Sequence, residues 1–226
     1  ASASINGESI SKEAVMNKLH RLEFPALKTV EKKELRTLYI DADEDHVALQ
    51  YLEKKGDIRN PRINTVMPWI IYVYEGVEGD EEGRPHLINP KYFGGVYDGQ
   101  EAGGRLWTEV LEYLDEAYDL DAVERIYING DGAAWIRTGE KIIPKSKYAL
   151  DKYHMHKYII AATSHLEDSA EDARGEIYRA IHRKKKWMAE GAFDRIIGIT
   201  DKETKRKAVE QAKAYILGNW SGIMIA

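Results

Sequence analysis

The run Asp41–His46 contains four acids and a histidine within six positions, between β-rich runs at 35–40 and 47–52. Acids at the end of a hydrophobic strand supply the oxygen ligands that a hard cation such as Mg²⁺ prefers. The alternative is a solvated hairpin tip, although such tips usually carry Gly, Asn or Pro. None of these three residue types occurs between 41 and 46, and this run alone leaves both interpretations open.

A second acid, Asp131, stands between Gly130 and Gly132, directly after the β-rich run Arg125–Asn129. The two glycines let the backbone turn sharply and let a bulky ligand approach. Gly-Asp-Gly is also common turn chemistry. The tripeptide therefore points to a site only if the strand before it lies beside another strand that ends in acids.

The elements that must position these acids follow from the hydrophobic pattern. We expect strands at about 35–43, 46–52, 66–74, 125–129 and 146–150, helices at 8–22, 105–118 and from Asp151 onward, and a short helix at 133–136. Helical patterns continue at about 167–190 and 201–217. The stretch 75–104 is rich in Gly and acids, which predicts a long irregular connection.

This order of elements, βββαβαβ, predicts an α/β fold. It is the order of an RNase H-like mixed five-stranded sheet, 3-2-1-4-5, with flanking helices and a C-terminal helical insertion. The first and fourth strands are neighbours in such a sheet, so the acids that follow them converge at the carboxyl ends of the strands. Converging carboxylates repel each other unless a divalent cation lies between them. Two such ions ~3.5–4 Å apart activate a water or a 3′-hydroxyl and stabilise the leaving oxygen of a phosphodiester.

The formal net charge of −5 over 226 residues does not by itself indicate a nucleic-acid-binding protein. Charge is uneven, however, with a basic run at 183–186 and acids concentrated at 41–45 and 78–82. The absence of cysteine excludes disulfides and cysteine-ligated metal centres. No apolar run approaches the ~18 residues of a membrane span and no signal peptide is visible, which favours a cytoplasmic protein without a membrane partner.

Four segments carry a resemblance to a known family: Ala42–Gln50, Leu87–Gly95, Asn129–Ile136 and Leu150–Ile159. Together they resemble the insertion-sequence transposases of the ISL-re group, which were long described only as an uncharacterised protein family. That group is similar to the Mutator-like transposases, whose RNase H-like catalytic domain carries a DDE triad of acids. The resemblance covers essentially the whole chain. It implies metal-dependent cleavage and strand transfer of DNA at insertion-sequence ends.

The resemblance implies that Asp43 and Asp131 are the first two acids of the triad and that both bind metal, with Asp41 as the rival for the first place. Asp151 and His154 resemble an acid-x-x-His element that supports the site; a helix cap and a packed surface residue are the alternative. The implied cofactor is Mg²⁺ or Mn²⁺ in a two-metal site. The implied partners are double-stranded DNA, at transposon ends and target, and further copies of the chain in a homo-oligomer on the prokaryotic nucleoid.

The family's third acid is a Glu that follows the helical insertion, and Tyr215–Ile223 resembles the segment just upstream of it. We therefore expect the third acid beyond residue 226, and we expect residues 1–226 to be inactive alone. Glutamates on helix surfaces are usually only solvated, but four in the helical region are alternatives: Glu167, Glu171, Glu176 and Glu190.

Three regions are expected: the end of an N-terminal helix-turn-helix-like DNA-binding region at 1–28, the catalytic core at 29–166, and the helical insertion at 167–226. The insertion can contact DNA in this class of enzyme, which assigns DNA binding to four successive basic residues, Arg183, Lys184, Lys185 and Lys186. A solvated helix face is the alternative. Two other functions stay open: an RNase H-like nuclease, and a non-catalytic DNA-binding or assembly fragment.

Overall fold

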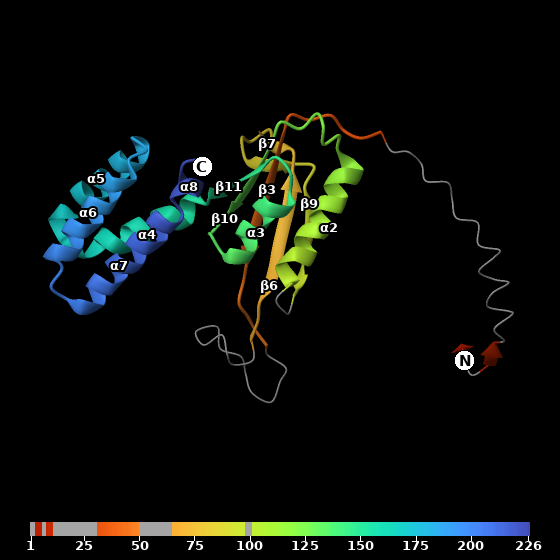
Figure 1. The fold of residues 1–226 in the computed structure, drawn as a ribbon, viewed down its shortest axis with the longest axis horizontal. Helices are drawn as coiled ribbons and strands as arrows, with labels where there is room; N and C mark the ends of the chain where they lie inside the picture. The colour runs from red at the N-terminus through yellow and green to blue at the C-terminus, as the bar shows by residue number, and fades with distance from the viewer. Residues whose placement is uncertain (1–2, 6–7, 11–30, 50–64, 98–100) are drawn as a thin grey trace. The chain divides into compact units, whose positions relative to one another are not determined.

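The computed structural model describes residues 3–5, 8–10, 31–49, 65–97 and 101–226 (Figure 1). The chain divides into two compact units, 1–31 and 32–226. In the first unit, β1 (Ala3–Ile5) pairs antiparallel with β2 (Glu8–Ile10). The prediction of a helix from residue 8 is therefore wrong for 8–10, and its remainder at 11–22 lies outside the described residues.

The second unit is built on a mixed sheet of five strands: β3 (Thr37–Glu44), β6 (Pro68–Tyr74), β9 (Lys91–Val96), β10 (Arg125–Gly130) and β11 (Ser146–Leu150). Their spatial order is β11-β10-β3-β6-β9. The pairs β3–β10 and β10–β11 are parallel, whereas β3–β6 and β6–β9 are antiparallel. The predicted neighbourhood of the strands at 35–43 and 125–129 is thus confirmed, and both strands run toward the same edge.

The predicted second strand at 46–52 is wrong. Only β4 (Val47–Ala48) forms there, and it pairs with β5 (Thr65–Val66) rather than with β3; residues 50–52 lie outside the described part. The antiparallel partner of β3 is β6, the run predicted as the third strand. The acids at 41–45 are therefore not a hairpin tip, since β3 and β4 continue as one arm of a longer hairpin whose other arm is β5 and β6.

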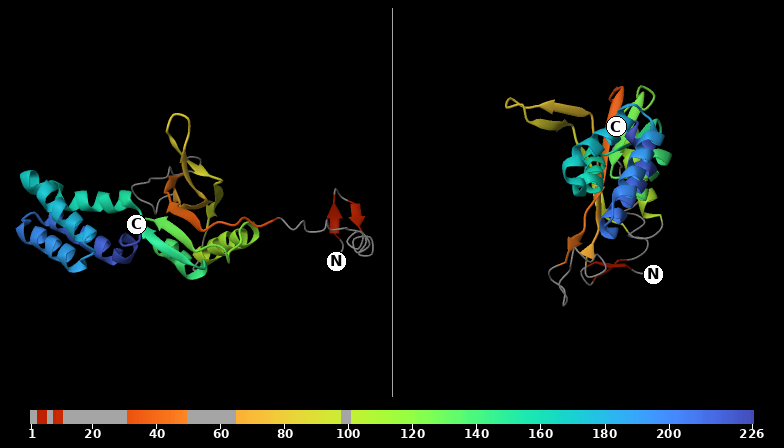
Figure 2. Two further views of the ribbon diagram at one scale, coloured as in Figure 1. Left: turned by 90° about the horizontal axis from the view of Figure 1, so that it is seen from above. Right: turned by 90° about the vertical axis from the view of Figure 1, so that its left-hand side faces the viewer.

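The connection predicted to be irregular, 75–104, contains three strands. The strands β7 (Gly76–Gly79) and β8 (Pro85–Ile88) make a hairpin, and β9 pairs with β6 as the sheet's edge strand. Paired glycines at 94–95 hid β9, because glycine normally weakens a strand. The third strand in chain order is therefore Lys91–Val96, and the β7–β8 hairpin projects from the sheet on the side opposite α2 (Figure 2).

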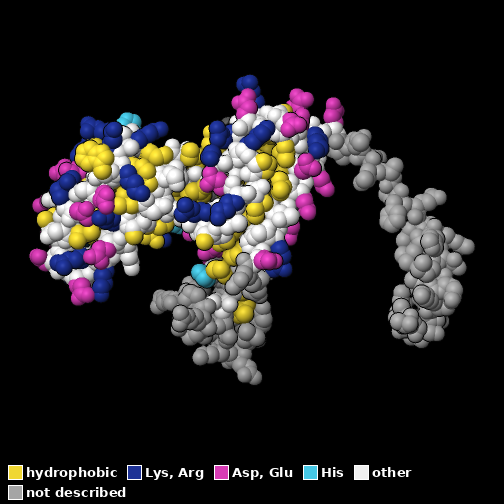
Figure 3. All heavy atoms as spheres, viewed as in Figure 1, with side chains coloured by type: hydrophobic (Ala, Val, Ile, Leu, Met, Phe, Trp, Pro, Cys, Tyr) yellow, Lys and Arg dark blue, Asp and Glu magenta, His cyan; other side chains and the backbone are white. Residues whose placement is uncertain are grey.

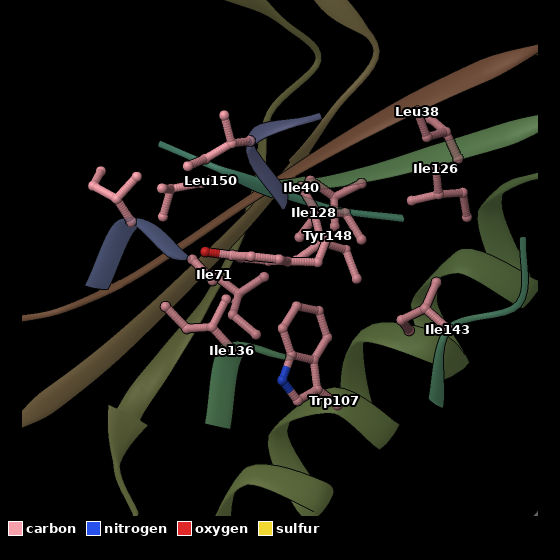
Figure 4. Close-up of a cluster of buried hydrophobic side chains, with 14 of the residues drawn as sticks. Leu38, Ile40, Ile71, Trp107, Ile126, Ile128, Ile136, Ile143, Tyr148 and Leu150 are labelled. Carbon is pink, nitrogen blue, oxygen red and sulfur yellow. The ribbon is translucent and has the colours of Figure 1, made fainter. Parts of the chain in front are cut away.

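Two helices cover one face of the sheet, α2 (Ala102–Ala117) and α3 (Ala134–Ile142). The alternation on β3 and β10 turns Leu38, Ile40, Ile126 and Ile128 toward these helices, where they are fully or almost fully buried. They meet Trp107 of α2 and the ring of Tyr148 in one cluster (Figure 4). This apolar face fixes the register of the strands, because a slip by one residue would turn the acids of β3 into the core.

A second set of helices follows β11: α4 (Lys152–Thr163), the 3₁₀ helix η1 (Ser164–Ser169), α5 (Ala170–His182), α6 (Lys186–Ile199), α7 (Glu203–Gly218) and α8 (Trp220–Ile223). Helix α7 packs on α4 and α6, and α8 returns to the sheet against β11. Small residues such as Ala162, Ala192 and Ala212 are buried in this packing. Among the described residues, no helix is long and apolar enough to cross a membrane.

Two glycines in the helices that cover the sheet give a matched test of this packing. A Cβ at Gly139 would lie 2.6 Å from the ring of Trp107, whereas a Cβ at Gly104 would meet nothing within 4 Å. Gly139→Ala should lower the free energy of unfolding by about 1–3 kcal/mol through overpacking. Gly104→Ala should raise it by about 0.5–1 kcal/mol, because Ala loses less entropy in a helix. Urea denaturation of both variants measures the difference, and a stable Gly139→Ala protein would contradict the packing of α3 on α2.

Candidate acidic site at the carboxyl ends of three parallel strands

Of the acids in the run 41–45, only two face the main cavity. Asp41 and Asp43 alternate with buried residues of β3, so they point to the sheet face that α2 and α3 leave uncovered. Glu44 instead accepts a hydrogen bond from the indole N–H of Trp135 in α3. Asp45 is exposed, and its Oδ1 accepts from the backbone N–H of His46 at 2.7 Å.

Strand register brings three acids level with one another. Asn129 of β10 pairs with Asp41 of β3, and Gly130 pairs with Leu150 of β11. Continued past these pairs, the same register places Asp131 opposite both Asp43 and Asp151. A cavity of about 570 Å³ at this edge is lined by Asp41, all three level acids and His154. The structure thus gathers the five side chains that the sequence singled out for the site.

Asp41 is the hydrogen-bond centre of the uncovered sheet face. Its Oδ1 accepts from Asn129 Nδ2 at 2.6 Å and from the Tyr74 hydroxyl at 3.2 Å. Burial and the Asp41 charge raise the pKa of Tyr72 to about 12, and burial followed by the same charge also raises the pKa of Tyr74. Both phenols therefore keep their protons at neutral pH, and the Tyr74 hydroxyl donates a hydrogen bond to Asp41.

Asp43 and Asp131 are bound differently from Asp41. The Oδ1 of Asp43 accepts from the N–H of Glu44 at 2.8 Å, and the Oδ1 of Asp131 accepts from the N–H of Ala133 at 2.8 Å. In the described part of the chain, neither carboxylate has a hydrogen bond at its other oxygen. Each aspartate is therefore held by its own turn and keeps one oxygen available to a ligand.

Asp151 uses both of its carboxylate oxygens. It is the N-cap of α4, where Oδ1 accepts from the N–H of Tyr153 at 2.7 Å. Its Oδ2 lies 2.7 Å from Nδ1 of His154, and the two side chains are 36% and 25% exposed. The sequence left open a cap or a site pair, and the structure shows that Asp151 caps the helix while the pair also lines the cavity.

The Gly130–Gly132 loop is held by residues of β11 and of the helical region. The Tyr148 hydroxyl donates to the Gly130 carbonyl at 3.1 Å, and the Tyr215 hydroxyl donates to the backbone carbonyl of Asp131. Gly132 has a φ of 98°, and a Cβ there would lie 2.6 Å from Oδ1 of Asn219. The position of Asp131 therefore depends on helix α7 and on the residue that follows it.

Four of these supporting side chains were not predicted from the sequence: Tyr74, Asn129, Tyr215 and Asn219. Tyr74, Asn129 and Tyr215 lie 33, 88 and 84 residues along the chain from the groups that they contact. No local sequence pattern therefore indicates these contacts. The only available signal was the alternation of Tyr and Asn with apolar residues on β6 and β10, which marks a half-buried polar face.

Among the described residues, the predicted metal ligands do not form a cluster of three, and the basic run lies away from the acidic cavity. Within the ranges that the structure describes, no three Asp, Glu or His side chains are placed so that they could hold a metal ion. The basic residues at 183–186 lie at the junction of α5 and α6 and do not line the acidic cavity. Any contact they make with a ligand is therefore separate from the acids.

Two glycines with positive φ test how tightly the Asp131 loop is held. Gly132→Ala adds both an unfavourable φ, worth about 1–2 kcal/mol, and a clash with Asn219. Gly83 has a φ of 76°, but a Cβ there would meet nothing within 4 Å, so Gly83→Ala adds only the first cost. Thermal or urea unfolding should show Gly132→Ala to be the less stable variant by a further ~1–3 kcal/mol. Equal losses would contradict the close packing of Asn219 on the loop.

The family model "Uncharacterised protein family (UPF0236)" matches residues 2–226. Two multi-copy UPF0236 proteins of Caldanaerobacter subterraneus subsp. tengcongensis are 40% and 38% identical to the chain over 220 residues. The matches cover 96% of this chain and 43% of each relative, so the chain spans less than half of the length of these relatives.

Among solved structures, the NurA nuclease of Sulfolobus solfataricus matches over 84% of this chain and 45% of its own, with 12% identity and a TM-score of 0.20. A TM-score this low does not indicate a shared fold. The family assignment therefore depends on the sequence matches, which extend over nearly all of the chain. The chain belongs to the uncharacterised protein family UPF0236.

Proposed function

We propose that this chain is the catalytic core of a DNA transposase, which cleaves and transfers DNA strands at insertion-sequence ends by metal-dependent phosphoryl transfer. The observation that carries the proposal is that Asp43, Asp131 and Asp151 line one cavity at the carboxyl ends of three parallel strands. Numbered along the chain, the five strands lie in the order 3-2-1-4-5. That order is the one expected of an RNase H-like domain.

The copy number of the relatives supports a mobile element. The names of the two UPF0236 relatives each combine several gene loci of one bacterium. A transposase gene multiplies with the element that carries it, so many near-identical copies in one genome are what such a gene produces. A housekeeping nuclease has no comparable reason to be repeated.

The donor set fits a hard divalent cation. Asp43 and Asp131 each have one carboxylate oxygen that accepts from a backbone N–H, and both residues line the same cavity. Carboxylate oxygen is the ligand that Mg²⁺ and Mn²⁺ favour. When bound, such ions lower the pKa of an attacking water and stabilise the leaving oxygen. We assign the two metal-binding and catalytic positions to Asp43 and Asp131.

Asp41 fits the first position less well than Asp43. Its Oδ1 already accepts two side-chain hydrogen bonds, from Tyr74 and Asn129, so a metal ion would bind at this oxygen only by displacing or sharing them. We assign it the role of orienting the tyrosine-lined face beside the metal ligands. Asp151 and His154 support the site as a hydrogen-bonded pair whose carboxylate also fixes the start of α4.

The proposed nucleic-acid contact lies outside the cavity. Arg183, Lys184, Lys185 and Lys186 stand at the turn between α5 and α6, where their charge suits the phosphates of transposon-end DNA. Target DNA and further copies of the chain complete the proposed assembly.

An RNase H-like nuclease is the second candidate. In this case the metal ions held by the same acids would activate water as the nucleophile that attacks an RNA–DNA hybrid. Its substrate, rather than its acids, would distinguish it from a transposase. A non-catalytic DNA-binding or assembly fragment is the third candidate. In this third case the carboxylates would bind no metal.

Three Asp→Asn substitutions in a full-length family member carrying these residues test the assignment. Asp43→Asn and Asp131→Asn should each reduce Mn²⁺-dependent cleavage of cognate ends by roughly 100-fold or more, because a charged ligand is lost while the shape is kept. DNA binding should persist in both variants. Asp45→Asn is the matched control, since Asp45 belongs to the same acidic run but does not line the main cavity, and its cleavage should be unchanged.

The same assay separates the alternatives. Loss of cleavage in Asp41→Asn with retention in Asp43→Asn would transfer the first position to Asp41. Hydrolysis of an RNA–DNA hybrid without cleavage of insertion-sequence ends would establish the nuclease. Unchanged cleavage in both Asp43→Asn and Asp131→Asn would disprove the proposed site.

A further inference from the structure

The first turn of α6 carries one of the most exposed large hydrophobic side chains among the described residues. Trp187 is 70% exposed, although it belongs to a helix whose neighbouring residues Ala189, Ala192 and Phe193 are buried. An indole offers a large apolar area and a flat π-face, and tryptophans left in water commonly mark an interface. The exposure of Trp187 therefore points to a partner that contacts this turn.

The backbone of the turn places basic residues around this ring. Helix α5 ends in a Schellman arrangement, in which the N–H of Lys184 donates to the Ile181 carbonyl and the N–H of Lys185 donates to the Ala180 carbonyl. Lys184 has a φ of 56°, in the position where glycine is usual. A basic side chain is thus present at a position where the backbone conformation favours glycine. Helix α6 starts two residues later, at Lys186.

The cations of this turn are not neutralised by acids in the described part of the chain. Among the residues that the structure describes, Arg183, Lys184, Lys185 and Lys186 take part in no ion pair. They form a locally positive surface on a chain whose net charge is −5. Figure 3 shows Lys and Arg side chains beside hydrophobic ones over this helical part of the molecule. Cations of this kind next to an exposed ring match a polyanion that also carries flat apolar groups.

Beside the ring lies a small hollow of about 230 Å³, lined by Glu176, Arg179, Trp187, Met188, Gly191 and Arg195. It is smaller than the roughly 300–1,000 Å³ of sites for drug-sized ligands. Its rim combines guanidinium donors with a carboxylate acceptor, since Arg195 pairs with Glu176 at 2.7 Å. A single flat heterocycle with both donors and acceptors on its edge suits this arrangement.

We propose that this turn binds nucleic acid with an unpaired base stacked on Trp187, while Arg183 and Lys184–Lys186 contact the adjoining phosphates. Stacking requires a free base face, which a closed duplex does not offer. Single-stranded DNA, or a duplex with an unpaired end, therefore binds this surface better than a closed duplex. The inference rests on the DNA contact in the proposed function and adds the state of the DNA that the contact selects.

The test uses the 226-residue chain with EDTA present, so that the acidic cavity plays no part. Fluorescence anisotropy measures the affinity for a labelled single-stranded oligonucleotide and for a duplex of the same sequence whose ends are closed by ethylene glycol linkers, because the terminal pairs of a blunt end would offer a free base face. Trp187→Ala should weaken single-strand binding by about 5- to 150-fold, the factor that corresponds to 1–3 kcal/mol of stacking. Duplex binding should change less than about twofold, and Trp187→Phe should keep most of the single-strand affinity.

Two control variants separate stacking from a general loss of contact. Ile199→Ala removes another exposed apolar side chain of the same helix, which is 65% exposed, and should leave both affinities unchanged. Replacing Lys184, Lys185 and Lys186 by Ala should weaken binding of both DNA forms and reduce its salt dependence.

Equal single-strand affinity of Trp187→Ala and the unaltered chain would overturn the stacking proposal while leaving the proposed function intact. Unchanged affinity in the triple lysine variant would remove the DNA contact from the proposed function itself. Trp187-dependent binding to vesicles of phosphatidylcholine and phosphatidylserine, without single-strand binding, would assign the surface to a membrane and overturn the proposal as well.

Discussion

The parallel pairing of β3, β10 and β11 is the constraint on which the rest of the structure depends. It brings three chain segments to the same edge of the sheet and sets Asp43, Asp131 and Asp151 level there. The apolar face of these strands enforces the register, because a slip by one residue would expose Leu38 and Ile40 and bury the acids. The shared cavity of the three carboxylates therefore depends on a core that lies on the other side of the sheet.

The helical region contacts this edge of the sheet directly. Tyr215 and Asn219, at the end of α7, contact the loop that carries Asp131, and the ring of Tyr215 stacks on Tyr158 of α4 at 3.8 Å between ring centroids. Helix α7 also packs on α6, which begins at Lys186 and carries Trp187 in its first turn. The basic turn and the loop that carries Asp131 are thus both connected to the same set of packed helices.

Part of this arrangement could be predicted from the sequence and part could not. The strands near 35–43 and 125–129, the helix near 105–118 and the cap at Asp151 follow from local periodicity and capping chemistry. The partner of β3 was predicted wrongly, because 46–52 is as β-rich as β6 and strand pairing is not a local property. The glycines of β9 concealed an edge strand. The hydrogen bonds of Asp41, and the hydrogen bond from Tyr215 of α7 to the Asp131 carbonyl, are tertiary contacts. A single sequence carries no signal for them.

The central claim is that Asp43 and Asp131 bind one divalent cation between them, and anomalous diffraction from crystals soaked in Mn²⁺ tests it most directly. The account predicts an anomalous peak within about 2.0–2.2 Å of a carboxylate oxygen of both residues, as for a hard cation of this size, and loss of that peak in Asp131→Asn crystals. A peak held by Asp41 without Asp43, or a cavity without Mn²⁺ at saturating concentration, would contradict the account.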